Sequence, residues 1–218
     1  MHAIVTTPRA LASLLVYNGL VQEQKNTQTG ILLLLASIGF ITVVDTGAKY
    51  MTADLPPLQL VWGYFLGIFT ALCCLAIIRG RRQTQQLSTR RPWMHVGRAG
   101  LLVLSISLLF VALSRMSLAD ATAISFTSPL FITLLAIPIL GERVDKGRWL
   151  AVLGGLCGVL VVVRPGSGLA SWVSLLPLFG ALAFAAFQIV TRLLASTENT
   201  FTTLFCTGLF GLLWSSLA

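Results

Sequence analysis

Seven long apolar runs dominate the sequence and restrict its fold more than any other feature. An α-helix rises about 1.5 Å per residue and the hydrocarbon core of a bilayer is about 30 Å thick, so one crossing takes about 20 apolar residues. The runs lack the alternation of a barrel strand, and backbone groups inside lipid need internal partners, so helices are expected. We expect an all-α polytopic membrane protein with about seven transmembrane helices, at approximately residues 31–49, 58–78, 93–113, 118–140, 147–163, 172–191 and 201–218.

The composition argues against other classes of protein. With 56% hydrophobic residues, 10% charged residues and a mean hydropathy of +0.88, the chain has too little polar surface for a soluble domain. The formal charge of +8 is spread over short gaps between apolar runs, so we expect a lipid bilayer and no nucleic acid as partner. The four cysteines lack metal-ligand spacing and no catalytic motif is present, so we expect no metal, no cofactor and no enzyme.

Lysine and arginine are distributed unevenly between alternate gaps. Positive residues are retained on the cytoplasmic side of a membrane protein. With a cytoplasmic N-terminus, twelve of the fifteen lie inside, whereas Lys49, Arg115 and Arg164 lie outside. The twelve are Arg9, Lys25, Arg79, Arg81, Arg82, Arg90, Arg91, Arg98, Arg143, Lys146, Arg148 and Arg192. We expect a multi-pass protein of the inner (cytoplasmic) membrane with its N-terminus in the cytoplasm.

The first and sixth runs show a weak internal repeat. A shift of 143 residues places residues 43–51 over residues 186–194, so that Asp45 and Lys49 coincide with Gln188 and Arg192. Chance alignment of two apolar helices is the alternative. Copies separated by five spans are inverted relative to one another in the membrane, which is the arrangement that secondary transporters use for alternating access.

Residues 119–166 resemble the fourth and fifth helices of the EamA-type drug/metabolite transporters. The matching features are Pro129, the Leu-Gly-Glu that ends at Glu142, and the stop at Arg164, Pro165 and Gly166, together with Ala48, Lys49 and Tyr50 at the end of the first run. The resemblance covers about residues 30–218. It implies ten helices in two inverted five-helix repeats, no cofactor, and transport of small metabolites.

Residues 10–21 are moderately apolar but too short to span a membrane, and no small-residue cleavage site follows them, so we expect residues 1–30 to form a mobile or interfacial lead-in, with a signal peptide as the alternative. The resemblance implies that residues 31–166 form the first repeat of five helices and residues 171–218 the first two helices of a second repeat. We expect a secondary transporter of a small metabolite or drug-like solute. Because the chain stops inside its seventh run, the alternative is a truncated, non-transporting remnant or a membrane assembly partner.

Small residues in the fifth run, Ala151 with Gly155 and Gly154 with Gly158, favour close helix packing. This packing is expected either inside the bundle or at the interface of a homodimer.

The fourth run contains a predicted helix break. Pro129 lies about 14 Å beyond Asp120, near the middle of the bilayer, and frees the carbonyl of Ser125. Ser125, Thr127 and Ser128 surround that carbonyl, so these polar groups are candidates for lining a substrate site. A static kink that is satisfied by its own side chains is the equal alternative.

The first span supplies a second set of candidates. Asp45 is expected inside the hydrocarbon with Lys49 one turn further, which favours either a substrate-binding or proton-coupling pair or a snorkelling Lys49 neutralised by Asp45. Gln188 is its counterpart in the repeat. Tyr64 occupies the second-helix position where many members of the resembled family carry a basic residue, so no anion contact is implied there, and Tyr64 is kept as a candidate for substrate contact.

Overall fold

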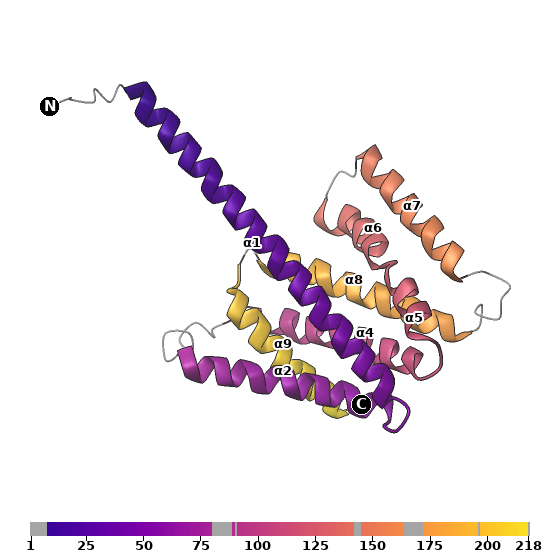
Figure 1. The fold of residues 1–218 in the computed structure, drawn as a ribbon. Coiled ribbons are helices and arrows are strands. Elements are labelled where there is room, and N and C mark those ends of the chain that lie inside the picture. Colours follow the sequence, from indigo (N-terminus) through magenta and orange to yellow (C-terminus); the bar gives the residue numbers. More distant parts are fainter. Residues whose placement is uncertain are drawn as a thin grey trace. The chain divides into compact units, whose positions relative to one another are not determined.

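The computed structural model describes residues 8–79, 89, 91–141, 145–163, 172–195 and 197–217, with side chains described from residue 28 onward apart from a few in α2 and α7. Every regular element in these residues is helical (Figure 1). The helices are α1 (Pro8–Met51), α2 (Pro57–Arg79), α4 (Pro92–Leu113), α5 (Leu118–Ser125), α6 (Ser128–Leu140), α7 (Lys146–Val163), η1 (Trp172–Ser174), α8 (Leu175–Ala195) and α9 (Thr200–Leu217). The chain divides into two units, Met1–Gly47 and Ala48–Ala218.

The first unit contains most of α1, a helix of 44 residues that begins at Pro8. Proline is favoured in the first turn of a helix because its missing N–H has no intrahelical partner there. The helix is longer than one bilayer crossing, and its apolar segment is Gln28–Met51. Residues 8–27, which lie in the expected lead-in, are therefore helical in their backbone.

The second unit is organised around α4. This helix packs against α8, α9, α2 and α5, and α2 packs in turn along α9 (Figure 1). The main core cluster joins Val61 and Phe65 of α2 to Val103 and Phe110 of α4, with Leu113 at the end of α4. Burial of these side chains against one another fixes the packing of α2 on α4.

Two glycines permit the closest helix contacts. A Cβ atom at Gly180 of α8 would lie 3.2 Å from the backbone oxygen of Ser105 in α4. At Gly211 of α9 it would overlap the Phe65 ring of α2. Glycine is therefore needed for the observed approach of α8 to α4 and of α9 to α2.

The fourth expected span consists of two helices, α5 and α6, separated at Phe126 and Thr127. Both pack against α8 and α7. The second of them ends at Gly141, whose φ of +67° is the left-handed conformation that favours glycine at a helix C-terminus. Glu142 and Arg143, which follow this helix in the sequence, lie outside the described residues.

Six helical segments of the described chain are long and apolar enough to cross a membrane: Gln28–Met51, Pro57–Ile78, Pro92–Leu113, Leu118–Leu140, Trp172–Ala195 and Thr200–Leu217. The fifth of the seven expected spans forms α7, which has 18 residues and is not one of these six. Large apolar side chains are exposed on the helices, for example Ile77 at 80% and Phe40 at 72%. Such exposure fits lipid as the surrounding solvent, so the expected all-α polytopic membrane fold is confirmed.

Candidate functional site

The helix break between α5 and α6 is compact. Phe126 and Thr127 keep right-handed helical backbone angles, and the N–H of Thr127 donates to the carbonyl of Ile124 at 3.0 Å. The carbonyl of Thr127 accepts from the N–H groups of Leu130 at 3.0 Å and Phe131 at 3.2 Å. Pro129 lies in the first turn of α6, where its missing N–H is no loss.

The hydroxyl groups at the break donate to backbone carbonyls three or four residues earlier in the chain. Ser125 Oγ donates to the carbonyl of Ala121 at 2.9 Å, and Thr127 Oγ1 donates to that of Ile124 at 2.7 Å. Thr127 is buried, Ser128 is half-buried and Pro129 is exposed. The local bonds favour the kink that is satisfied by its own side chains, although each hydroxyl oxygen can still accept a further hydrogen bond.

The break and Gln188 belong to the same part of the second unit. Both α5 and α6 pack against α8, and Gln188 is a half-buried residue of α8. The polar groups of the break therefore lie against the helix that carries Gln188.

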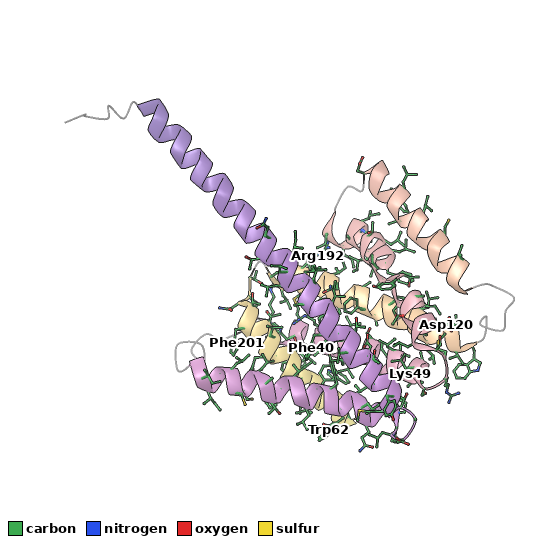
Figure 2. The ribbon with its side chains drawn as sticks, viewed as in Figure 1. Phe40, Lys49, Trp62, Asp120, Arg192 and Phe201 are labelled. Atoms are coloured by element: carbon green, nitrogen blue, oxygen red, sulfur yellow. The ribbon has the colours of Figure 1, made fainter. Side chains whose placement is uncertain are left out.

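Lys49 binds the C-terminal end of α4. Its Nζ donates to the carbonyl of Leu113 at 2.6 Å and to that of Met116 at 2.9 Å, and the side chain is half-buried (Figure 2). The last carbonyls of a helix lack intrahelical partners and carry partial negative charge, so a cation is favourable there. Lys49 thus joins residues 48–51 to the end of α4. Asp45 precedes it by one turn of α1 and belongs to the first unit.

Tyr64 is anchored beside the main core cluster. Its ring contacts Phe110 of α4 edge to face, with centroids 6.5 Å apart and an interplanar angle of 78°. Such contacts add to the stabilisation from burial. The half-buried Tyr64 side chain therefore helps to join α2 to α4.

The charges near the opening of α5 have local partners. Ser117 caps α5, because its Oγ accepts from the N–H of Asp120 at 3.1 Å and donates to the Asp120 carboxylate. The Arg115 guanidinium lies 5.1 Å from the centroid of the Trp172 ring. The Ser117 bonds are typical of helix capping, and the Arg115 contact is typical of a surface cation packed on an aromatic ring.

Arg98 is a functional candidate that the sequence reasoning missed. It was counted among the cytoplasmic gap residues, but it lies inside α4 and is 3% exposed. Its Nε donates to Thr191 Oγ1 of α8 at 2.7 Å, one terminal nitrogen donates to the carbonyl of Thr203 of α9 at 3.2 Å, and its guanidinium lies 4.8 Å from the Phe187 ring centroid. Its place within an apolar run was the available signal, because a charge inside a span needs partners.

His95 lies one turn before Arg98 and is 1% exposed. Neither Nδ1 nor Nε2 of its ring has a hydrogen-bond partner among the described residues. Buried polar atoms without partners are uncommon in proteins and mark sites of strain or function.

Comparison with known proteins identifies the family. Residues 28–164 match the EamA-like transporter family. The chain is 29% identical over 167 residues to a riboflavin transporter of Rhizobium johnstonii, covering 77% of this chain and 55% of that protein. It is 26% identical over 181 residues to an S-adenosylmethionine uptake transporter of Rickettsia prowazekii, covering 83% of this chain and 60% of that protein.

A further relative is Protein RarD of Salmonella typhi, 28% identical over 184 residues, with 82% of this chain and 60% of that protein covered. The chain spans about half to three fifths of the length of these curated relatives. No solved structure matches it. Since the family match covers more than half of the chain, this polytopic membrane protein belongs to the EamA-like transporter family.

Proposed function

We propose that the chain works in a secondary transporter that moves a small metabolite across the cytoplasmic membrane by alternating access. The observation that carries the proposal is the family match over residues 28–164, in a chain with six described helical segments of membrane-spanning length. Two of the relatives are named for the transport of riboflavin and of S-adenosylmethionine. Both solutes combine a heteroaromatic ring with polar groups, so they are the first substrates to test.

The substrate region of this proposal includes the break between α5 and α6, Gln188 of α8 and Tyr64 of α2. Two observations support it: Ser128 and Gln188 are half-buried polar residues, and α5 and α6 pack against α8. Asp45, in the first unit, is proposed by itself as a substrate-binding or proton-coupling residue, because a carboxylate inside the membrane is costly unless it is paired, binds a ligand or carries a proton. Lys49 is the proposed charged member of the substrate region. Lys49 would combine this role with its bonds to the end of α4.

An inverted-repeat arrangement is part of the proposal. The alignment of residues 43–51 with residues 186–194 supports it. A cytoplasmic N-terminus is also part of the proposal, because eleven Lys and Arg lie in the inner gaps and three in the outer gaps once Arg98, which lies inside α4, is left out. Single cysteines introduced into a background without the four native cysteines test the orientation. A cysteine at position 54 should react with an impermeant thiol reagent added outside intact cells, whereas one at position 86 should not. Outside labelling at position 86 would reverse the topology.

Transport is tested by expressing the full-length gene product and measuring uptake and efflux of labelled riboflavin and S-adenosylmethionine. We expect flux of one of these solutes, or of a related metabolite, above that of vector-only cells. Asp45→Asn should insert normally and lose flux or its pH dependence, because the change removes the charge and keeps the size. The matched control is Asp54→Asn, at an exposed position between α1 and α2. Equal expression with unchanged flux across pH would remove Asp45 from the site.

A role as a non-transporting assembly partner or homodimer is the second candidate, and α7 favours it. Among the described residues no atom lies within 4 Å of a Cβ placed at Gly154, Gly155 or Gly158. The described part of the bundle thus leaves space beside these small residues, which supports their use at the interface of a homodimer. Crosslinking of a cysteine at position 155 between two chains in native membranes tests the dimer. Monomeric behaviour together with measured flux would exclude this alternative.

A further inference from the structure

One end of α4 carries a polar cluster inside an otherwise apolar bundle. Arg98 is its centre, because its guanidinium binds α8 through Thr191 and α9 through the carbonyl of Thr203. The Phe187 ring of α8 covers the same guanidinium. Three helices are thus joined by one buried cation.

His95 shares the helical face of Arg98, since residues three apart on a helix are neighbours. Its ring is 1% exposed, and both nitrogens lack hydrogen-bond partners in the described part of the chain. A neutral imidazole presents one donor and one acceptor, and both are without a partner among the residues that the structure describes. His95 is the fourth residue of α4, about 4.5 Å along the helix axis from Pro92, so it lies near the end of the span.

Charges of both signs act on the His95 ring. Arg98 acts on it from the same helix, and Glu198 acts on it from the turn between α8 and α9. Thr89 Oγ1 donates to the Glu198 carboxylate at 3.0 Å. Cys206 of α9 has a buried thiol, and the charges of Glu198 and Arg98 act on it electrostatically.

The other charged groups on the neighbouring helices are exposed, distant or undescribed. Arg192 of α8 is exposed. Asp120 of α5 lies near the opposite end of α4, where Ser117 Oγ donates to its carboxylate. The Arg79 side chain of α2 lies outside the described residues.

We propose that His95 is a proton-binding site whose protonation weakens the Arg98 contacts that join α4 to α8 and α9. One proton passes from water to the unprotonated ring nitrogen and returns when the pH rises, and no other bond is made or broken. The imidazolium is repelled by Arg98 and attracted by Glu198. Repulsion between the imidazolium and the guanidinium displaces Arg98 from Thr191 and Thr203, so α4 loosens from its two partners. This site is independent of which solute is transported.

The chain contains native reporters for the test. It has two histidines, His2 and His95, so His2→Gln leaves a single histidine signal. Trp214 Nε1 of α9 donates to the carbonyl of Val96, the residue after His95, at 3.2 Å. Its indole N–H signal therefore reports the contact of α9 with α4.

The experiment follows both signals by NMR in the chain labelled with ¹⁵N at histidine and tryptophan and reconstituted in lipid nanodiscs, between about pH 5 and pH 8. Loss of a peak in Trp214→Phe assigns the indole signal. In His2→Gln, the His95 ring and the Trp214 indole should change with the same midpoint. In His95→Gln, the Trp214 signal should be constant over this range.

The His2→Gln titration needs no substitution at His95, so the test stands even where His95→Gln fails to fold. A His95 ring signal that stays constant across the range would overturn the proton site. A ring that titrates while the Trp214 signal stays constant would overturn its link to the α4 contacts. Both results leave the transport proposal untouched, because no solute is present.

Discussion

The two ends of α4 are each held by a cation from within the bundle, but the two cations are stabilised differently. At the C-terminal end, Lys49 donates to the carbonyls of Leu113 and Met116, which α4 and the turn after it supply without any special side chain. Toward the N-terminal end, Arg98 needs a threonine hydroxyl, a carbonyl and an aromatic ring from α8 and α9.

The helix dipole explains this difference. A helix C-terminus carries partial negative charge and favours a cation, whereas the N-terminal half offers no such stabilisation. A cation near the N-terminal end therefore depends on acceptors from other helices, and its removal should disturb more of the bundle. Substitutions that each remove one of these contacts compare the two ends of α4.

Arg98→Met should give the largest loss of stability, about 2–3 kcal/mol. It removes two hydrogen bonds and a ring contact, and leaves the buried Thr203 carbonyl with one partner fewer. Unfolding of the purified chain in mixed detergent micelles measures the change. Arg91→Met is the matched control, because Arg91 is an exposed cation next to the start of α4. Equal losses for the two variants would show that charge near this end of α4 matters, and not the contacts of Arg98.

Gly180→Ala should cost about 1 kcal/mol and tests the middle of α4. The added Cβ would lie 3.2 Å from the backbone oxygen of Ser105, so α8 has to shift away from α4. The same unfolding assay measures it. Gly63→Ala in α2 is the control, since the described residues leave space around a Cβ at that position. If Gly180→Ala leaves the free energy of unfolding unchanged, the polar contacts at the two ends of α4 position this helix, and the close packing between them does not.

Lys49→Met should cost about 1 kcal/mol, less than Arg98→Met, because the carbonyls it leaves belong to a helix end that polar headgroups or water can reach. Lys49→Arg retains the charge and the donors and should recover most of the loss. Flux by the full-length product, corrected for the amount inserted, separates the two roles of Lys49. If Lys49→Arg restores stability without flux, Lys49 also contacts the transported solute. If it restores both, the bonds of Lys49 to the end of α4 account for the effect of Lys49→Met.

Hydrophobicity predicts much of the fold because lipid imposes helices on any long apolar run. The expected runs correspond to α1, α2, α4, the pair α5 and α6, α7, α8 and α9. The break was expected inside one helix around Pro129, whereas α5 ends at Ser125 and a new helix begins at Ser128, so that the proline lies in a first turn where it is tolerated.

The site is harder to predict because its partners are distant in the sequence or have no residue signature. The acceptors of Arg98 are 93 and 105 residues away, and those of Lys49 are backbone carbonyls. The rule that an intramembrane charge needs a partner identified Asp45 and applied equally to Arg98, but the assignment of Arg98 to a gap hid it.

Arg115→Met should have the smallest effect, about 0.5 kcal/mol or less, and it tests the C-terminal end of α4 a second time. Arg115 is the second residue after the end of α4, so it lies close to the same partial negative charge as Lys49. Its exposed guanidinium contacts the ring of Trp172 and not a carbonyl among the described atoms. If proximity to the helix end is what stabilises a cation, Arg115→Met and Lys49→Met should lower the unfolding free energy equally. If the two hydrogen bonds of Lys49 carry the stabilisation, Lys49→Met should cost clearly more. The same unfolding assay decides between them at two salt concentrations, because a long-range charge effect is screened by salt and a buried hydrogen bond is not.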